Sequence, residues 1–215
     1  MKCKGRILTV IAAVVALSVC CTAQAGIYSF DVFTANGIYG DNPGLNLRAE
    51  VFNGDGTATF KFYNDSLFDC SVTQIFFDDG TLLGISSLEN GPGTDFGTGE
   101  VTPGPGNLPS GENLTPDFVA DREFSIAPFP PSSGNGIETG EWASVTFDLI
   151  NGGTLQDVLD ELANGELRVG IHIQSFPDGS SESALMVPEP ATALTLAMGG
   201  LLIAGSRRIR KSYGL

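Results

Sequence analysis

The stretch that decides the fold runs from residue 45 to residue 64 and reads LNLRAEVFNGDGTATFKFYN. On both sides of a central Asn-Gly-Asp-Gly sequence at 53–56, apolar and polar residues alternate with a period of two. Such alternation is typical of a strand with one buried face and one wet face, because successive side chains of a strand point to opposite sides. Glycines beside Asn or Asp favour a tight hairpin turn. The stretch therefore predicts a β-hairpin.

The same alternation recurs along the chain. It is clear at 143–149 and 167–174, and weaker at 28–32, 72–77 and 124–126. Several short strands separated by turn residues are typical of an all-β domain. We predict a mainly β protein, an antiparallel β-sandwich of the jelly-roll type.

One short helix is expected among these strands. Thr154 is a suitable N-cap, and Gly165 is a suitable stop. Between them, apolar residues follow helical spacing, at Leu155, Val158, Leu159 and Leu162. Residues 90–117 are rich in Gly and Pro and too long for an ordinary connection, so we interpret them as a functional loop or a tether.

The first 25 residues have the three parts of a secretory signal. A cationic start precedes an apolar run at 7–19, and the small residues Ala23 and Ala25 follow it. We therefore predict cleavage after Ala25 by signal peptidase and passage through the export machinery. A lipoprotein signal acylated at Cys20 or Cys21 is a weaker alternative, because a large residue precedes Cys20. A retained anchor is a further alternative, but the run is short for a span of about 20 residues.

The last 28 residues, 188–215, combine a Pro-Glu-Pro tripeptide, an uncharged segment at 191–205 and a basic tail at 206–215. As a helix, the uncharged segment would reach about 22 Å, against a hydrocarbon core of about 30 Å. Snorkelling cations and local thinning of the bilayer would allow it to span as a single transmembrane helix. A cytoplasmic stop is expected at Arg207, Arg208, Arg210 and Lys211. A buried core helix is the alternative, and the terminal cations argue against it.

The two prolines of the tripeptide predict an extended strip from Val187 to Pro190 just above the membrane, a recognition site and not a fold element, where a protease can grip the backbone. The sequence Val187-Pro188-Glu189-Pro190, its short apolar segment and its basic end resemble the PEP-CTERM sorting signal of bacterial surface proteins. The resemblance implies recognition of Pro188, Glu189 and Pro190 by exosortase, a membrane-embedded protease. It also implies a membrane-anchored precursor that is delivered to the cell envelope or the extracellular polysaccharide matrix. The segment GELRVGIHIQSFPDGSSESAL at 165–185 is also similar to passengers that carry such tails.

Residues 26–187 remain as one extracytoplasmic domain. They hold 24 of the 25 acidic residues but only four of the 11 basic ones, a formal charge of −20. Such a surface repels nucleic acid, so nucleic acid is not an expected partner. Acidic oxygens can recruit Ca²⁺ or simply keep an exported protein soluble. The weak candidates for Ca²⁺ are Asp78, Asp79, Asp178 and Glu182, which are equally compatible with acidic turns.

No motif in residues 26–187 predicts catalysis. His172 is the chain's one histidine, and its place on the polar face of a strand predicts an exposed side chain. Cys70 is the one cysteine left after signal cleavage and is expected to be buried. Trp142 and Phe52 also fall on wet faces, where aromatic rings can stack on sugars or lie beneath a loop. We therefore predict a structural, adhesive or carbohydrate-binding module and no enzyme; the alternative is a secreted glycoside hydrolase that uses acidic residues.

Overall fold

The computed structural model describes residues 25–54, 56–78, 84–98, 106–121 and 123–189. Several predictions fall outside these residues, namely residues 1–24 of the signal peptide with Ala23, Asp79, Pro190, the segment at 191–205 and the basic tail. Within the described residues, no helix is long and apolar enough to cross a membrane.

The described chain is mainly β, with one α-helix. In chain order the strands are β1 Gly26–Val32, β2 Leu47–Gly54, β3 Thr57–Asn64, β4 Ser71–Asp78, β5 Ile85–Asn90, β6 Phe96–Thr98, β7 Ile126–Pro128, β8 Ile137–Glu138, β9 Trp142–Asp148, β10 Arg168–Gln174 and β11 Glu182–Pro188. The helix is α2, Leu155–Asn164, and short 3₁₀ turns occupy Gly111–Asn113 and Ile150–Gly152.

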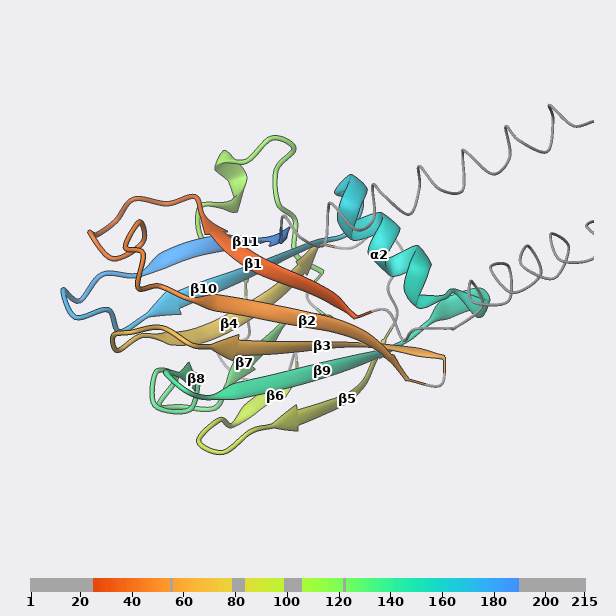
Figure 1. The fold of residues 1–215 in the computed structure, drawn as a ribbon, viewed down its shortest axis with the longest axis horizontal. Helices are drawn as coiled ribbons and strands as arrows, with labels where there is room; N and C mark the ends of the chain where they lie inside the picture. The colour runs from red at the N-terminus through yellow and green to blue at the C-terminus, as the bar shows by residue number, and fades with distance from the viewer. Residues whose placement is uncertain (1–24, 55, 79–83, 99–105, 122, 190–215) are drawn as a thin grey trace, which may run out of the picture.

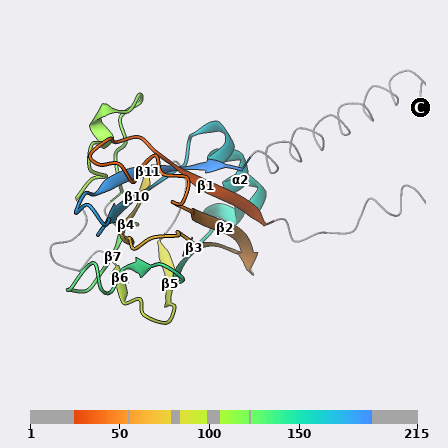
Figure 2. The same cartoon turned by 60° about the vertical axis from the view of Figure 1, so that its left-hand side comes forward.

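The described strands form one continuous antiparallel sheet. Its order is β5-β9-β3-β2-β1-β11-β10-β4-β7-β6, with β8 paired to β4. The sheet bends over at β1 and β11, so that β10, β4, β7 and β6 face β2, β3, β9 and β5 (Figure 2). The prediction of an antiparallel, sandwich-like domain is therefore confirmed, but its two layers are halves of one sheet.

The decisive hairpin and the helix both form where the sequence predicts them. β2 and β3 pair from Leu47 opposite Asn64 to Gly54 opposite Thr57, and Gly56 supplies a φ of +73° in the turn. Thr154 caps α2 through the amide of Asp157, whose side chain binds back to Thr154. Gly165 ends the helix in the left-handed region, at φ +79°.

Four strands were not predicted, namely β5, β6, β8 and β11. β6 and β8 are too short to show a period, and β5 carries little apolar alternation. β11 includes the fully buried Glu182, which interrupts the apolar pattern. These strands form because a partner strand lies beside them, and that information is not local.

Aromatic rings fill the space between the two layers. Phe77 of β4 meets Phe147, Phe60 and Phe62 of the facing strands, with ring centroids 4.8, 5.2 and 6.4 Å away and edge-to-face geometry. All four rings are buried. A smaller cluster of Phe76, Leu108 and Phe118 covers the opposite side of β4, so β4 is buried on both faces. The layers are thus held together by burial of large apolar area.

Replacing Phe77 by Ala should lower the free energy of unfolding by about 3–5 kcal/mol, because it leaves a cavity among three rings. Urea denaturation followed by circular dichroism measures this loss. Leu67→Ala is the control, since Leu67 is 86% exposed and its truncation should change stability by less than about 0.5 kcal/mol. Similar losses in both variants would show that Phe77 does not anchor the core.

Candidate functional site

The first half of the sorting motif belongs to the sheet. Val187 pairs with Ser29 and Pro188 with Tyr28, and the Glu189 amide donates to the Ile27 carbonyl at 3.3 Å. Val187 and Pro188 are extended, as predicted. The prediction that the strip is not a fold element was wrong for Val187 and Pro188, because neither residue's neighbours in space can be read from the sequence.

The proline is accommodated because its missing N–H is not needed for pairing with β1. The amide of Phe33 donates to the Ser183 carbonyl at 3.1 Å, and the Glu189 amide donates to the Ile27 carbonyl. In an antiparallel pair, residues that exchange hydrogen bonds recur every second position, so the odd-numbered residues of β11 face β1. Pro188 therefore turns its nitrogen to the other edge of β11. There, β10 pairs with β11 only from Glu182 to Leu185.

The strand that holds the motif starts in a tightly packed place. A Cβ on Gly26 would approach the Tyr28 ring to 2.6 Å and Leu159 of α2 to 2.9 Å, so a larger residue there would have to displace these side chains. Burial raises the pKa of the neighbouring Tyr28 to about 12. The start of β1 and the end of β11 therefore lie together at the end of the domain where α2 packs (Figure 1).

Glu182, a candidate Ca²⁺ ligand, is used inside the protein. It is fully buried, and its carboxylate accepts hydrogen bonds from the Thr34 hydroxyl at 2.5 Å and from the amides of Asn36 and Gly37 at 2.8 Å. Charge-assisted bonds of this kind compensate the cost of burying a carboxylate. The side chain thus fixes the connection between β1 and β2, and its oxygens are already engaged.

Asp178 also holds the connection between β1 and β2, from its solvent-exposed side. Its carboxylate accepts bonds from the Ser180 hydroxyl at 2.6 Å, from the Ser180 amide at 3.0 Å and from the Ile38 amide at 3.3 Å. The Ser180 hydroxyl and amide hold the pKa of the Asp178 carboxyl below its ordinary value. Among the described residues, no group of three or more His, Cys, Asp or Glu side chains is placed to hold a metal ion.

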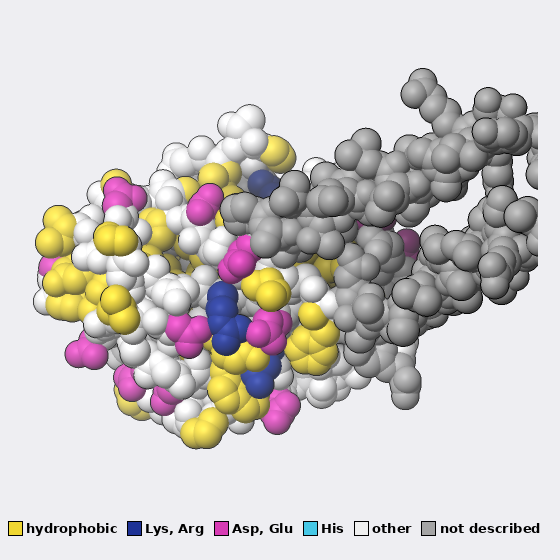
Figure 3. Space-filling view, viewed as in Figure 1, with side chains coloured by type: hydrophobic (Ala, Val, Ile, Leu, Met, Phe, Trp, Pro, Cys, Tyr) yellow, Lys and Arg dark blue, Asp and Glu magenta, His cyan; other side chains and the backbone are white. Residues whose placement is uncertain are grey.

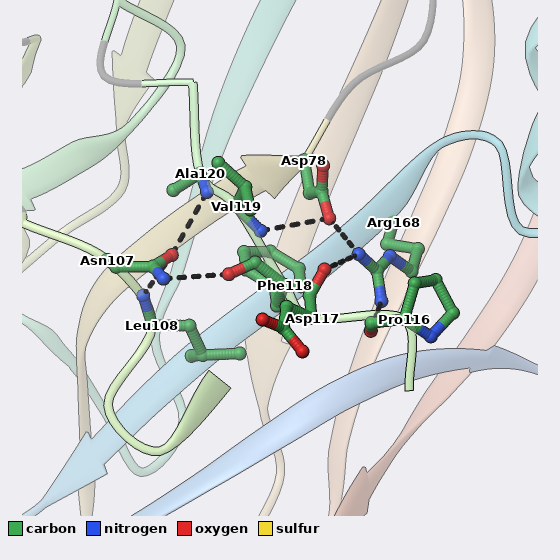
Figure 4. A network of polar contacts seen from close by, with 9 residues as sticks. All are labelled: Asp78, Asn107, Leu108, Pro116, Asp117, Phe118, Val119, Ala120 and Arg168. Carbon is green, nitrogen blue, oxygen red and sulfur yellow. Dashed lines mark hydrogen bonds and ion pairs between the residues drawn. The ribbon is translucent and has the colours of Figure 1, made fainter. Parts of the chain in front are cut away.

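Asp78, the remaining described candidate, forms an ion pair with Arg168 across β4 and β10 (Figure 4). Asp78 also accepts a bond from the Val119 amide at 3.1 Å. The Arg168 guanidinium donates to the carbonyls of Pro116 at 2.7 Å and Asp117 at 2.5 Å. The pair therefore fastens the 106–121 segment to the sheet. A guanidinium suits this role because it presents several donors in a fixed plane.

The same segment is also braced by hydrogen bonds within itself. The Asn107 side chain donates to the Phe118 carbonyl at 2.7 Å and accepts from the Ala120 amide at 3.0 Å (Figure 4). Leu108 lies directly on Gly170, where a Cβ would come within 2.5 Å of it. Of the long segment at 90–117, residues 96–98 form β6 beside β7, whereas residues 106–117 pack over one face of β4 and β10 and are therefore not a free tether.

His172 lies on the covered face and not in solvent, so the prediction of an exposed histidine was wrong. Its side chain is 9% exposed, burial lowers its pKa, and Nδ1 is 3.5 Å from the buried Ser183 hydroxyl. Two residues along the strand, Gly170 lies beneath Leu108 of the second apolar cluster. Periodicity could not reveal this, because the residues that cover the face come from a distant segment. Cys70 is buried as predicted, and burial raises the pKa of its thiol.

The side of β2, β3 and β9 that points away from the core carries a cluster of cations and aromatic rings. We call this surface the outer face. It comprises Arg48, Glu50, Lys61, Tyr63 and Trp142, whose side chains alternate with core residues. Lys and Arg atoms gather there, bordered by acidic and apolar atoms (Figure 3). Arg48 and Lys61 are two of the three cations among the described residues, so this is where positive charge is concentrated.

The rings and cations of the outer face stack on one another. The Arg48 guanidinium lies 3.7 Å from the centre of the Tyr63 ring, and Lys61 Nζ lies 3.6 Å from the centre of the Trp142 ring. Arg48 also pairs with Glu50 at 2.5 Å and with Asp65 at 2.8 Å. Burial raises the pKa of the Tyr63 hydroxyl, and the negative charge of Glu50 raises it further. The face thus offers half-buried aromatic edges beside fixed donors and acceptors.

The loops at the opposite end from Gly26 and Pro188 form a third feature. Tyr39, Phe68 and Phe176 pack together from three connections, with ring centroids 4.9 to 6.1 Å apart. Ile38 and Leu67 are 77% and 86% exposed beside this trio. An open depression of about 360 Å³ lies nearby, between two of these connections and the end of β8, lined by Asp69, Cys70, Glu138, Thr139 and Ser175.

Comparison with known proteins gives no assignment: no family model, no curated protein and no solved structure matches the chain.

Replacing Glu182 by Gln should cost about 2 kcal/mol of unfolding free energy or more, because an amide N–H₂ then faces the donors of Thr34, Asn36 or Gly37. Glu89→Gln is the matched control, since Glu89 is an exposed residue of β5 and its change should cost less than about 0.5 kcal/mol. Urea denaturation measures both. Equal stability of the two variants would contradict the structural role of the buried carboxylate.

Proposed function

We propose that this chain is an exported bacterial surface protein and a substrate of exosortase. It would be exported by a signal peptide at 1–25 and held briefly by a transmembrane helix at 191–205. Its Pro188-Glu189-Pro190 motif would then direct processing and transfer to the cell envelope or the extracellular matrix. The motif, its apolar segment and its basic end support this proposal through their resemblance to PEP-CTERM signals.

One structural observation carries the proposal furthest. β1 and β11 are paired neighbours, and Glu189 is hydrogen-bonded to Ile27, so the described chain enters and leaves the domain at one place (Figure 1). A precursor that is attached to a membrane at both ends needs this arrangement, because the domain can then sit on one side of the bilayer without strain. The loops around Ile38 and Leu67 would point away from that membrane.

The domain itself is proposed to be a non-catalytic module that contacts extracellular polysaccharide. The outer face supports this, because aromatic rings with polar neighbours suit the mixed apolar and hydroxyl surface of a sugar. The carboxylates that resemble ligand or catalytic groups in the sequence are engaged in holding connections, as for Glu182 and Asp78. No observation favours the hydrolase alternative over this one.

The sorting proposal predicts the effect of replacing Pro188 and Pro190 by Ala. In a host that contains exosortase, this variant should remain as full-length precursor in the membrane fraction, because the tripeptide loses its fixed extended geometry. The parent should lose its tail and leave that fraction. Mass spectrometry of the mature C-terminus and cell fractionation provide the readout.

The matched control for that experiment is Pro103→Ala with Pro105→Ala, which alters another Pro-x-Pro sequence of the same chain and should leave processing unchanged. A third variant, with Gln in place of Arg207, Arg208, Arg210 and Lys211, should be exported without trimming because its cytoplasmic stop is gone. Trimming of the Pro188 and Pro190 variant at the parent's rate would refute recognition of the tripeptide.

The polysaccharide proposal predicts that Tyr63→Ala weakens binding to matrix polysaccharide from the producing cells by about fivefold to tenfold, because the aromatic edge of Tyr63 and its support of the Arg48 guanidinium are lost. Phe129→Ala is the control, since Phe129 is 46% exposed on the other layer. Co-sedimentation of the exported protein with purified polysaccharide measures the effect. If the parent does not bind, or both variants bind equally, the outer face is not the glycan site.

A further inference from the structure

The position of the motif within the sheet leads to an inference about its control, which rests on the proposed function. We infer that the sorting motif is latent in the folded protein, and that the last residues of β11 must separate from β1 before a protease can act. The step is local: it involves Met186 to Glu189 and not the whole domain.

The pairing explains why the motif is hidden. A protease binds an extended backbone as a strand added to its own site and must surround the scissile bond, so a segment that is already paired within a sheet has to leave that sheet first. In the folded domain, the amides of odd-numbered residues in β11 face β1, and the bond from Glu189 to Ile27 extends this pairing into the tripeptide. One edge of Val187, Pro188 and Glu189 is therefore occupied by the protein's own first strand.

The same geometry explains why separation can be local. β10 pairs with β11 from Glu182 to Leu185 and no further, so the last residues of β11 are held from one side. Pro188 offers no N–H to a second neighbour. Glu182 holds the beginning of β11 through three hydrogen bonds to the β1–β2 connection. Strand ends with few contacts open more readily than strand centres, so β11 is divided into a fixed half and a releasable half.

The start of β1 affects when the motif is accessible. β1 begins at Gly26, the residue that follows the predicted signal cleavage, and Gly26 is packed against Tyr28 and Leu159. A chain whose β1 has not yet entered the sheet leaves the motif without its partner strand. The motif is therefore most accessible before folding is complete, and its accessibility falls once β1 is seated.

A reversible lock tests the inference directly. Ser29 and Val187 are opposite one another, and hydrogen-bonded pairs have Cα atoms about 5.5 Å apart, a separation that a disulfide can bridge. The variant Ser29→Cys with Val187→Cys is made in a Cys70→Ala background, which leaves no other cysteine in residues 26–215. Pulse–chase labelling in the exosortase host should show tail removal about tenfold slower or more in the oxidised chain than after dithiothreitol.

A loosening variant provides the opposite result. Ser29→Pro removes the N–H that faces Val187 while leaving the motif itself unchanged, so tail removal should be about fivefold faster, as expected when one hydrogen bond is lost from the closed state. The single variant Val187→Cys in the same background controls for the altered residue beside the motif. The melting temperature of each purified variant establishes that the domain is folded.

A readout independent of exosortase separates this inference from the sorting proposal. In detergent, proteinase K should cut the full-length chain between residues 186 and 189 more slowly when the disulfide is formed than when it is reduced, by the same factor of about ten or more. Equal rates in the oxidised and reduced chain, for proteinase K and in the host, would overturn the latent motif. Slow oxidised cleavage by proteinase K combined with no exosortase processing of the parent would refute the sorting proposal alone.

Discussion

The pairing of β1 with β11 is the constraint on which the rest of the structure depends. These two strands occupy the middle of the sheet order and join its two layers at the bend. Without β11, the half built from β10, β4, β7 and β6 would lose its connection to β1 and its alignment over the aromatic core. Because the first and last strands meet here, the domain closes only when both ends of the described chain are in place, a non-local contact that is costly in chain entropy.

Two of the three cations among the described residues of this acidic domain form ion pairs within it. Of its few cations, Arg168 is paired with Asp78 and holds the 106–121 segment, while Arg48 is paired with Glu50 and Asp65 on the outer face. The buried carboxylate of Glu182 likewise holds the β1–β2 connection in place. Removing a partner of Glu182, or one member of the Asp78–Arg168 pair, leaves a largely desolvated group unpaired, so Glu182 and Asp78 are structural requirements even though they resemble ligand sites in the sequence.

The sequence-based predictions succeeded where structure is local. The β2–β3 hairpin and α2 follow from periodicity, Asn-Gly and a capping residue, all of which act within a few positions. They failed for His172 and for β11, because burial of His172 and strand formation at Glu182–Pro188 depend on neighbours that are distant in the chain. Two of the described Ca²⁺ candidates have other partners for the same reason: Asp78 and Glu182 face an arginine and backbone amides, and the sequence does not state which groups a carboxylate will meet.

By itself, the sequence determined the fold class, the helix, the main hairpin and the presence of a Pro-Glu-Pro motif beside an apolar segment. Alternation and capping are properties of adjacent residues, and composition alone sets the acidic charge of the domain. The tertiary structure decided that the two layers are one folded sheet, that the segment at 106–121 covers β4 and β10, and that the motif begins inside a strand. Each of these depends on which distant segments pack together, since a hydrogen-bond ladder or a buried ring acquires its partner only when the chain has closed on itself.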